Sequence, residues 1–329
     1  MKKIIGIGNA IVDVVCKVDE NFLAENSLIK GSMCLIDNVT AQKLSQLSAE
    51  KITSGGSVAN SIAAVAQLGC KAGFIGKVGG DEFAQKFIKE IGKSGADFIS
   101  QHFSINATAK SFILVTPDAE RTMCTFLGCA SEISENDIDE KSLQDSSVLY
   151  LEGYLWDRPE TILALKKAIN LAKKHGVKIA FSLSDLFCVA RHKLDFIGLV
   201  QRDLDILFAN EGEIQELVGV TNIAENNFAK LQEFFAINKK LLALVTRNDK
   251  GCVVFSENKI TEVATKKVEK LTDTTGAGDC FAAGFLSAQL HGASLEKCAQ
   301  MGNLLAAKII QKFGARFDEN EITEIKKYL

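Results

Sequence analysis

The stretch Asp273-Thr274-Thr275-Gly276-Ala277-Gly278-Asp279 lies directly before a segment with helical spacing. Phe281, Phe285 and Ala288 recur there at intervals of four and three residues, which predicts that the glycine turn opens a helix. At a helix start the N–H groups of residues 276–278 lack helical partners and, together with the helix dipole, favour an anion. Glycine has no Cβ to obstruct a phosphate group. The stretch therefore predicts a phosphate site.

Asp279 ends this turn, where its negative charge would repel a bound phosphate. A carboxylate in that place suits a general base that takes the proton of an attacking hydroxyl group. The turn alone would also fit a structural interpretation, with Asp279 as a helix cap. The P-loop pattern GxxxxGK[ST] is missing, and the dinucleotide fingerprint GxGxxG is interrupted by Ile11 and Phe281. Neither a P-loop nor an NAD site is expected.

The composition of the 329-residue chain, 47% hydrophobic and 24% charged, is typical of a globular protein. A formal net charge of −3 without a broad basic cluster argues against nucleic-acid binding. The nine cysteines are scattered without a CxxC pair, which favours free thiols in the cytoplasm. No apolar run reaches the ~18 residues of a membrane span, so no membrane association is expected.

Short β-rich runs alternate with helical patterns from about residue 57 onward. This alternation predicts an α/β fold with a doubly wound, mostly parallel sheet flanked by helices. The predicted strands are 3–8, 73–78, 148–153, 178–182, 206–210 and 241–246, and the best-marked helices are 57–68, 81–94 and 159–175.

Two segments, 12–37 and 108–128, break this alternation and are rich in β-branched, sulfur-containing and aromatic residues. We predict that they pair as a small β lid over the carboxyl ends of the strands, where ligands bind in open α/β folds. The remaining segments, 1–11, 38–107 and 129–329, would form the large domain that binds ATP and substrate. Peripheral hairpins within one compact domain are the alternative.

The stretch 273–279 resembles the C-terminal signature of the ribokinase-like, or PfkB, kinases of sugars and nucleosides, and the resemblance covers essentially the whole chain. It implies an ATP-dependent kinase that phosphorylates the hydroxymethyl group of a ribose-type ring. It also implies that the turn of Gly276, Ala277 and Gly278 holds the transferring phosphoryl group and that Asp279 is the base. By the same resemblance Arg121 would reach the phosphates once the lid closes, with a solvated strand-end charge as the alternative.

Two further strings resemble nucleotide-side motifs of that family. Asn210-Glu211-Gly212-Glu213 is similar to the NxxE motif that organises Mg²⁺, which needs only one or two protein oxygens, although helix capping is the alternative for Asn210 and Glu213. The turn 246–251 resembles TxGxxG, with Asn248 replacing a glycine and tolerating the same positive φ. The resemblance leaves open whether Asp273 and Thr275 hold a monovalent cation such as K⁺. The expected nucleotide contacts are Asn210, Thr246, Asn248, Gly251, Thr275, Gly276, Gly278 and, near the adenine, Asn303.

Residues 8–13 and 55–61 combine glycines with amide, hydroxyl and carboxylate groups that suit vicinal hydroxyls. Both strings resemble the family's sugar-binding motifs and, together with Gly153-Tyr154 after a strand, the adenosine kinase branch in particular. By that resemblance two aromatic rings enclose a purine, which agrees with how rings stack on flat bases. The expected acceptor contacts are Asn9, Ile11, Asp13, Gly55, Gly56, Asn60, Met123, Thr125, Tyr154 and Phe187.

The predicted function is therefore phosphoryl transfer from ATP to the 5′-hydroxyl of a nucleoside, with adenosine as the first acceptor to test. A ribokinase- or fructokinase-type sugar kinase is the alternative within the same class, since the segment 120–128 follows a pattern of bacterial members whose acceptor the residues do not determine. A non-catalytic ligand-binding protein of the same fold is the alternative outside it. Both a monomer and a homodimer are compatible with the sequence.

Overall fold

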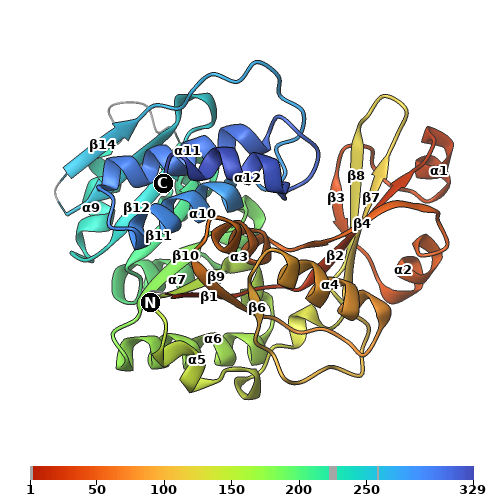
Figure 1. Cartoon of the computed structure of the whole chain (residues 1–329), viewed down its shortest axis with the longest axis horizontal. Coiled ribbons are helices and arrows are strands. Elements are labelled where there is room, and N and C mark those ends of the chain that lie inside the picture. Colours follow the sequence, from red (N-terminus) through yellow and green to blue (C-terminus); the bar gives the residue numbers. More distant parts are fainter. Residues whose placement is uncertain (1–2, 222–227, 258) are drawn as a thin grey trace.

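The computed structural model describes residues 3–221, 228–257 and 259–329, which form two sheets (Figure 1). The larger sheet has nine strands in the order β14-β13-β12-β11-β10-β9-β1-β5-β6. Neighbouring strands from β6 to β12 are parallel, and β13 and β14 extend one edge in antiparallel fashion. The strands are β1 (Lys3–Ile7), β5 (Lys71–Ile75), β6 (Asp97–Phe98), β9 (Val148–Glu152), β10 (Lys178–Ser182), β11 (Ile206–Asn210), β12 (Leu242–Thr246), β13 (Cys252–Ser256) and β14 (Lys259–Val263).

Helices cover both faces of this sheet because successive strand residues point to opposite sides. In β1, for example, Ile4 belongs to one buried cluster and Ile5 to the other. The doubly wound α/β prediction is therefore confirmed. One face carries α3 (Ser57–Gln67), α4 (Glu82–Lys93), α10 (Ala277–Leu290), α11 (Leu295–Ile309) and α12 (Glu319–Lys326), and the other carries α5 (Glu140–Gln144), α6 (Pro159–Lys174), α7 (Leu186–Arg202), α8 (Glu211–Val218) and α9 (Phe228–Ala236).

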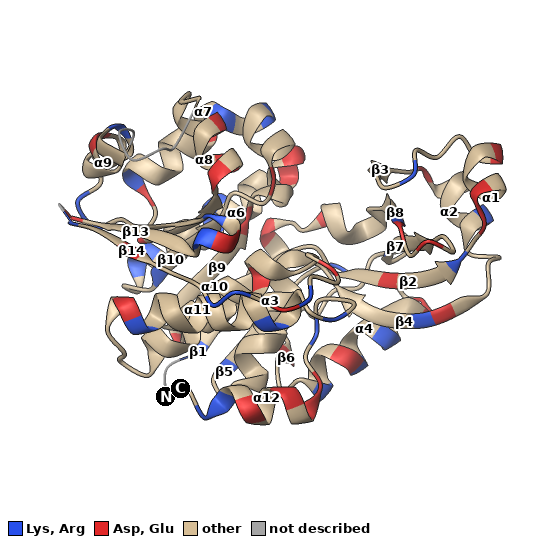
Figure 2. Ribbon diagram, turned by 90° about the horizontal axis from the view of Figure 1, so that it is seen from above, with Lys and Arg blue, Asp and Glu red and all other residues tan. Residues whose placement is uncertain are grey.

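The second sheet, called the small sheet below, has five strands in the order β3-β8-β7-β2-β4 and extends to one side of the larger sheet (Figures 1 and 2). β2 pairs with β7 and β3 with β8, so the predicted pairing of 12–37 with 108–128 is confirmed. Its strands are β2 (Ile11–Lys17), β3 (Met33–Leu35), β4 (Ala49–Gly55), β7 (Ala109–Val115) and β8 (Arg121–Phe126), accompanied by α1 (Glu20–Glu25) and α2 (Asn38–Leu44).

β4 also lies in the small sheet, although the sequence analysis placed all of 38–107 in the large domain. Its sequence, AEKITSG, has one large apolar residue, Ile52, and gives no strand signal of its own. It is held by antiparallel pairing with β2, from Ile11 opposite Gly55 to Cys16 opposite Ala49. The function of the small sheet as a lid stays a prediction.

Short turns of 3₁₀-helix follow three strands, η1 (Gly128–Glu132) after β8, η3 (Gly153–Asp157) after β9 and η5 (Asn248–Lys250) after β12, and η2 (Glu135–Asp137) lies between η1 and α5. The predicted strand 73–78 lies earlier, at Lys71–Ile75, and Gly76 begins the connection to α4. Among the described helices, none has the length and apolar character needed to cross a membrane.

Candidate active site

The glycine turn opens α10 as predicted. Gly276 has φ +77° and forms the N-cap, and a Cβ added to it would lie 2.5 Å from the Cβ of Ala315. Both the backbone conformation and the lack of space thus require glycine. The prediction of three unpaired N–H groups is wrong for Ala277, which donates to the Thr274 carbonyl at 3.1 Å because the turn closes on itself. Within the described chain the N–H groups of Gly276, Gly278 and Asp279 have no acceptor, so they remain available to an anion.

Asp273 anchors the turn through both carboxylate oxygens. Its Oδ1 accepts from the N–H (3.0 Å) and the hydroxyl (2.7 Å) of Thr275. Its Oδ2 accepts from the Gly314 N–H at 2.9 Å and forms an ion pair with Nη1 of Arg121 at 2.5 Å. Burial acts to raise the pKa of Asp273, but these hydrogen bonds and the Arg121 charge outweigh it and lower the pKa.

Arg121 begins β8 and reaches from the small sheet to the turn. Its side chain is 18% exposed and its guanidinium lies 5.0 Å from the centre of the Phe313 ring. The alternative of a solvated strand-end charge is therefore wrong. In this structure its partner is Asp273, and a contact with phosphate stays a prediction.

Asp279 is held by α3, which packs across α10. Ser57 Oγ donates to Oδ1 at 2.6 Å, and Asn60 Nδ2 donates to Oδ2 at 2.9 Å. A third bond joins the Ser61 hydroxyl to the Asp279 carbonyl at 2.9 Å. Burial raises the pKa of Asp279 to about 6, against the lowering effect of these side-chain hydrogen bonds and of Arg316. A fixed carboxylate that titrates near neutrality is well suited to general base catalysis.

Asn60 thus contacts Asp279 directly, and its Oδ1 is buried without a hydrogen-bond partner in the described structure. Such a buried acceptor costs free energy unless a ligand donates to it. Asn60 is therefore both a support for Asp279 and a candidate acceptor-binding residue.

Asp13 lies on β2 against the glycine pair that precedes α3. A Cβ on Gly55 would lie 2.4 Å from the Asp13 carboxylate, and one on Gly56, at φ +95°, would lie 2.1 Å from the Asn9 carbonyl. Both glycines make room for the predicted site residues. Burial raises the pKa of Asp13 to about 7, opposed by the charges of Arg316 and Arg121 and increased by that of Asp279.

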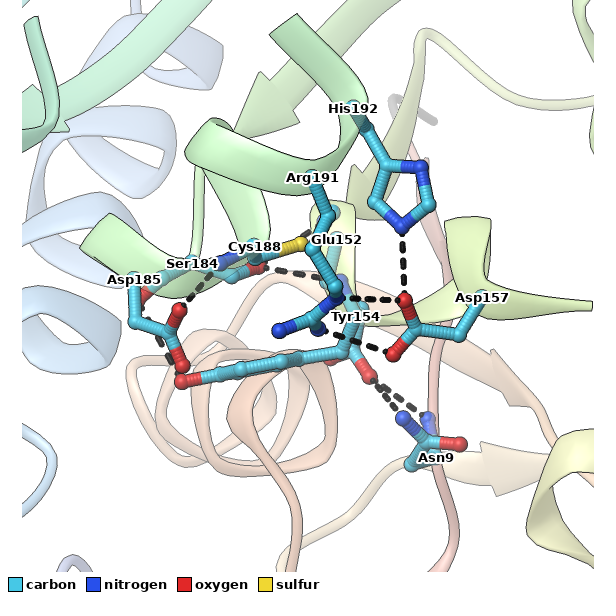
Figure 3. A network of polar contacts seen from close by, with 10 residues as sticks. Asn9, Glu152, Tyr154, Asp157, Ser184, Asp185, Cys188, Arg191 and His192 are labelled. Atoms are coloured by element: carbon cyan, nitrogen blue, oxygen red, sulfur yellow. Dashed lines mark hydrogen bonds and ion pairs between the residues drawn. The ribbon is translucent and has the colours of Figure 1, made fainter. Parts of the chain in front are cut away.

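The sequence analysis missed Glu152, which is fully buried at the end of β9 (Figure 3). Its Oε1 accepts from the backbone N–H (2.8 Å) and Nδ2 (3.0 Å) of Asn9, and its Oε2 accepts from the Val58 N–H at 2.8 Å. Burial raises its pKa to about 7. The amide oxygen of Asn9 points away from Glu152, so Glu152 orients Asn9. An acidic residue ending an otherwise apolar strand, just before Gly153-Tyr154, was the available signal.

Arg316 was also missed, because it follows the signature stretch by many residues and belongs to no motif. Its Nη2 donates to Ser54 Oγ at 3.1 Å. Its charge acts to lower the pKa of both Asp13 and Asp279.

The structure brings only some of the residues expected to surround the purine of a nucleoside close to one another. Tyr154 lies in η3, with its ring beside Asp185 and its hydroxyl donating to the Ser184 carbonyl at 3.4 Å (Figure 3). Phe187, in the first turn of α7, is 73% exposed and does not belong to the core. In the described part of the chain no ring contact joins Phe187 to Tyr154. A small pocket beside Tyr154 is lined by Asn9, Leu127, Ser131, Leu155, Asp157, Arg158 and Thr161.

On the small sheet, Met123 and Thr125 alternate along β8 and so face the same side. Thr125 is buried and exchanges a hydrogen bond of 3.0 Å with Ser111. Ile11, the first residue of β2, is partly exposed. Contacts of these three residues with a ligand stay a prediction.

Asn210 and Glu213 form a reciprocal capping box at the start of α8, the alternative weighed from the sequence. Asn210 Oδ1 accepts from the Glu213 N–H at 2.9 Å, while Glu213 accepts from the backbone N–H (2.9 Å) and Nδ2 (2.6 Å) of Asn210. Burial raises the pKa of Glu213 to about 7, and the charge of Asp185 adds to this effect. No group of three or more metal-ligating side chains occurs among the described residues.

The remaining nucleotide-side residues occupy turns between strands. Asn248 adopts φ +50°, as expected for a residue replacing glycine, and Gly251 adopts φ +84°. The Thr246 hydroxyl donates to the Ala209 carbonyl at 3.4 Å. Asn303 is buried, with its Nδ2 donating to the carbonyls of Val263 (3.0 Å) and Ala264 (3.3 Å).

Comparison with known proteins agrees with this geometry over nearly the full length. The model of the pfkB family carbohydrate kinases matches residues 1–322. The crystal structure of adenosine kinase from Sinorhizobium meliloti is 38% identical, with a TM-score of 0.88, and covers 100% of this chain and 99% of that one. A probable sugar kinase from Rhizobium etli CFN 42 is 34% identical, with the same TM-score and coverage. The adenosine kinase of Saccharomyces cerevisiae is 25% identical over 97% of this chain and 98% of that protein.

The residues matched by the family model thus include the glycine turn, Asp279 and the small sheet. The chain belongs to the pfkB family of carbohydrate kinases and is a phosphotransferase with a hydroxyl group as its acceptor.

Proposed function

We propose that this kinase transfers the γ-phosphoryl group of ATP to the 5′-hydroxyl of a nucleoside, with adenosine as the preferred acceptor. The observation that carries the proposal is the position of Asp279. Its carboxylate is fixed by Ser57 and Asn60 at the start of α10, next to the unpaired N–H groups of the glycine turn. A base and an anion site thus lie side by side.

In the proposed reaction, Asp279 accepts the proton of the 5′-hydroxyl as its oxygen bonds to the γ-phosphorus and the bond to the ADP oxygen breaks. The N–H groups of Gly276 and Gly278 donate to the phosphoryl oxygens, whose negative charge the dipole of α10 also favours. Asp13 and Asn9 hold the ribose hydroxyls. Positioning and electrostatics account for most of the catalysis of phosphoryl transfer, so this small set of groups is sufficient.

Magnesium fits the nucleotide side in terms of charge. The buried carboxylate of Glu213 has a raised pKa and lies near the negative charge of Asp185, so a cation there would relieve an unfavourable burial. Asn210 and Glu213 would hold Mg²⁺ largely through water, because their own atoms are bonded to each other. When bound with ATP, the metal supplies positive charge to the phosphate oxygens.

Two observations favour a nucleoside over a free sugar. Relatives that share the whole fold are described as adenosine kinases. In addition, a half-buried Tyr154 lies in η3 just after Glu152, the partner of Asn9, and an exposed Phe187 lies in the first turn of α7. A sugar kinase is the second candidate, since the Rhizobium etli relative is described as a probable sugar kinase. A purely binding protein would gain nothing from a base beside an anion site.

The proposal is tested by measuring kcat/KM of the wild type for adenosine, other nucleosides, ribose and fructose. Stacking on an aromatic ring is worth roughly 1–3 kcal/mol per base, and burial adds to it, so we expect adenosine to be preferred over ribose by more than about 10²-fold. Tyr154→Ala should reduce that preference and leave sugar turnover unchanged. Tyr328→Ala, at an exposed tyrosine near the C-terminus, is the matched control. Efficient ribose or fructose turnover without adenosine turnover would instead establish the sugar kinase.

A further inference from the structure

Two of the nine cysteine thiols lie side by side in the small sheet. Cys34 is the middle residue of β3, and it is directly paired with Cys124 of β8 in the parallel register of these two strands. Their Sγ atoms are 3.8 Å apart, although the two residues are separated by 90 positions in the chain. Among the described residues no other two thiols lie within hydrogen-bonding distance of each other. The fold thus creates a dithiol that no cysteine spacing in the sequence indicates.

The two thiols differ in their access to solvent. β3 is a three-residue strand at the edge of the small sheet, and Cys34 is partly exposed there (Figure 1). Cys124 is fully buried, and burial together with the neighbouring Cys34 raises its pKa to about 12. Because the thiolate is the nucleophile in thiol–disulfide exchange, Cys34 is the thiol that reacts first with a reagent from solution. Cys124 is then in place to react with Cys34.

The register of β3 and β8 permits a disulfide, but a strained one. Neighbouring strands lie ~4.8 Å apart, which is within the ~4.4–6.8 Å that separates the Cα atoms of a disulfide. The Cβ atoms of a disulfide, however, are only ~3.8 Å apart, so its formation has to draw the two strands together by roughly 1 Å. A bond formed under such strain is readily reduced again.

We propose that Cys34 and Cys124 are a reversible redox site whose disulfide slows phosphoryl transfer. The Cys34 thiolate attacks a low-molecular-weight disulfide such as oxidised glutathione, which releases one small thiol and leaves a mixed disulfide on Cys34. The Cys124 sulfur then attacks the Cys34 sulfur, which releases the second small thiol. The two protein thiols lose two electrons and the small disulfide gains them, and the two protein protons end on the released thiols.

The disulfide acts on turnover through β8, which begins with Arg121. The Arg121 guanidinium lies 2.5 Å from the Asp273 carboxylate of the glycine turn, and a displacement of about 1 Å in a catalytic site can cost up to about 100-fold in rate. Cys124 faces the opposite side of the sheet from Met123 and Thr125, so the disulfide does not fill the predicted acceptor side. The effect on turnover rests on the proposed role of Arg121, whereas formation of the disulfide does not.

The first test is chemical and needs no substrate. The wild type is treated with oxidised glutathione, the reagent is removed, and the free thiols are counted in denaturant, where we expect the nine thiols to have decreased by two. Tryptic digestion without reduction should yield peptides 31–43 and 122–141 joined to each other, and fragmentation should assign the bond to Cys124 rather than to Cys129 of the same peptide. Cys34→Ser should form no such bond. Cys70→Ser, at the other partly exposed cysteine, is the matched control and should form it as the wild type does.

A mixed disulfide that persists on Cys34, or a bond from Cys34 to another cysteine, would overturn the proposal. These outcomes are read without any enzyme assay. If no nucleoside or sugar is phosphorylated, the proposed function fails, and the thiol count and the joined peptides still decide whether the redox site exists.

The second test compares kcat of the reduced and the oxidised enzyme with whichever acceptor the wild type uses. Oxidation should lower kcat of the wild type at least about threefold, and dithiothreitol should restore it. Cys34→Ser should match the reduced wild type and should not respond to oxidised glutathione. An oxidised wild type with unchanged kcat would overturn the effect on turnover. An equal loss of activity in Cys34→Ser would assign the effect to another thiol and would also overturn the proposal.

Discussion

The two ends of the stretch 273–279 carry the same side chain in opposite environments. Asp273 accepts four hydrogen bonds, one of them from the Arg121 guanidinium, and its pKa is lowered. Asp279 is desolvated, is held by two neutral donors, and has a pKa raised to about 6. Asp273 is thus kept permanently charged as a structural anchor, while Asp279 can exchange a proton near neutral pH. The different surroundings of the two aspartates, rather than their residue type, thus give them different pKa values and different roles.

The largest expected effect is at the Asp279 end. Asp279→Asn preserves the shape and a hydrogen-bonding group but cannot accept the proton, so kcat should fall by ~10²–10⁴, the usual contribution of general base catalysis. Steady-state kinetics with unchanged acceptor KM would confirm this. The control is Asp139→Asn at the exposed N-cap of α5, which should leave kcat unaltered. If Asp279→Asn stayed within a few-fold of wild type, Asp279 would have no part in proton transfer.

Wild-type activity should decline as the pH falls through about 6, where Asp279 becomes protonated. The sign follows from the role of a base, which is active above its pKa. The loss should appear in kcat/KM of the free enzyme. A rate that is constant from pH 5 to 8 would separate Asp279 from the titrating step.

An intermediate effect is expected at the Asp273 end. Arg121→Ala leaves the Asp273 carboxylate without its cation and removes the charge that is predicted to reach the phosphates. We therefore expect kcat to fall roughly 10- to 100-fold, with a much smaller rise in acceptor KM. Lys30→Ala, which breaks two exposed ion pairs, with Glu20 and with Asp118, in the connection between α1 and β3, is the control. Unaltered turnover in Arg121→Ala would limit Arg121 to anchoring.

The smallest expected effect concerns monovalent cations. The sequence leaves open whether Asp273 and Thr275 hold K⁺. Because the Arg121 charge neutralises Asp273 and the Thr275 hydroxyl donates to it, the structure gives no support to a K⁺ site at these side chains. The turnover rates measured in potassium and in sodium at equal ionic strength should therefore agree within about twofold, because the Asp273 carboxylate already has a charged partner. A strong preference for potassium would mean that Arg121 leaves Asp273 during turnover.

Sequence reasoning succeeded where a signal is local. The helix start at Gly276, the positive φ of Asn248 and the central strands were all readable, since each depends on a few neighbouring residues. It failed for contacts made between distant segments. Glu152 meets Asn9 and Val58 across more than ninety positions, and Arg316 meets Ser54 across more than two hundred and fifty. Neither pairing leaves a periodic pattern in the chain.

Local reasoning also assigned the wrong partners to some correctly chosen groups. The N–H of Ala277 is consumed by the turn itself, and the polar atoms of Asn210 and Glu213 are used to cap α8. In each case the group forms a hydrogen bond within the protein at the start of a helix, so it is not free to bind a ligand. The sequence shows which groups are present, and only the folded backbone shows which of them are already bonded.

The contact between Gly276 and Ala315 constrains how this enzyme can be altered by loop exchange. An alanine at 276 would be unfavourable twice, through its positive φ and through collision with Ala315, whose Cβ would lie at 2.5 Å and whose Cα at 3.0 Å. Glycine at 315 would remove only the Cβ contact. A residue larger than alanine at 315 would displace the turn from the other side. Segments 273–279 and 314–316 are therefore sterically coupled. A chimaera that takes either segment from a relative should take both.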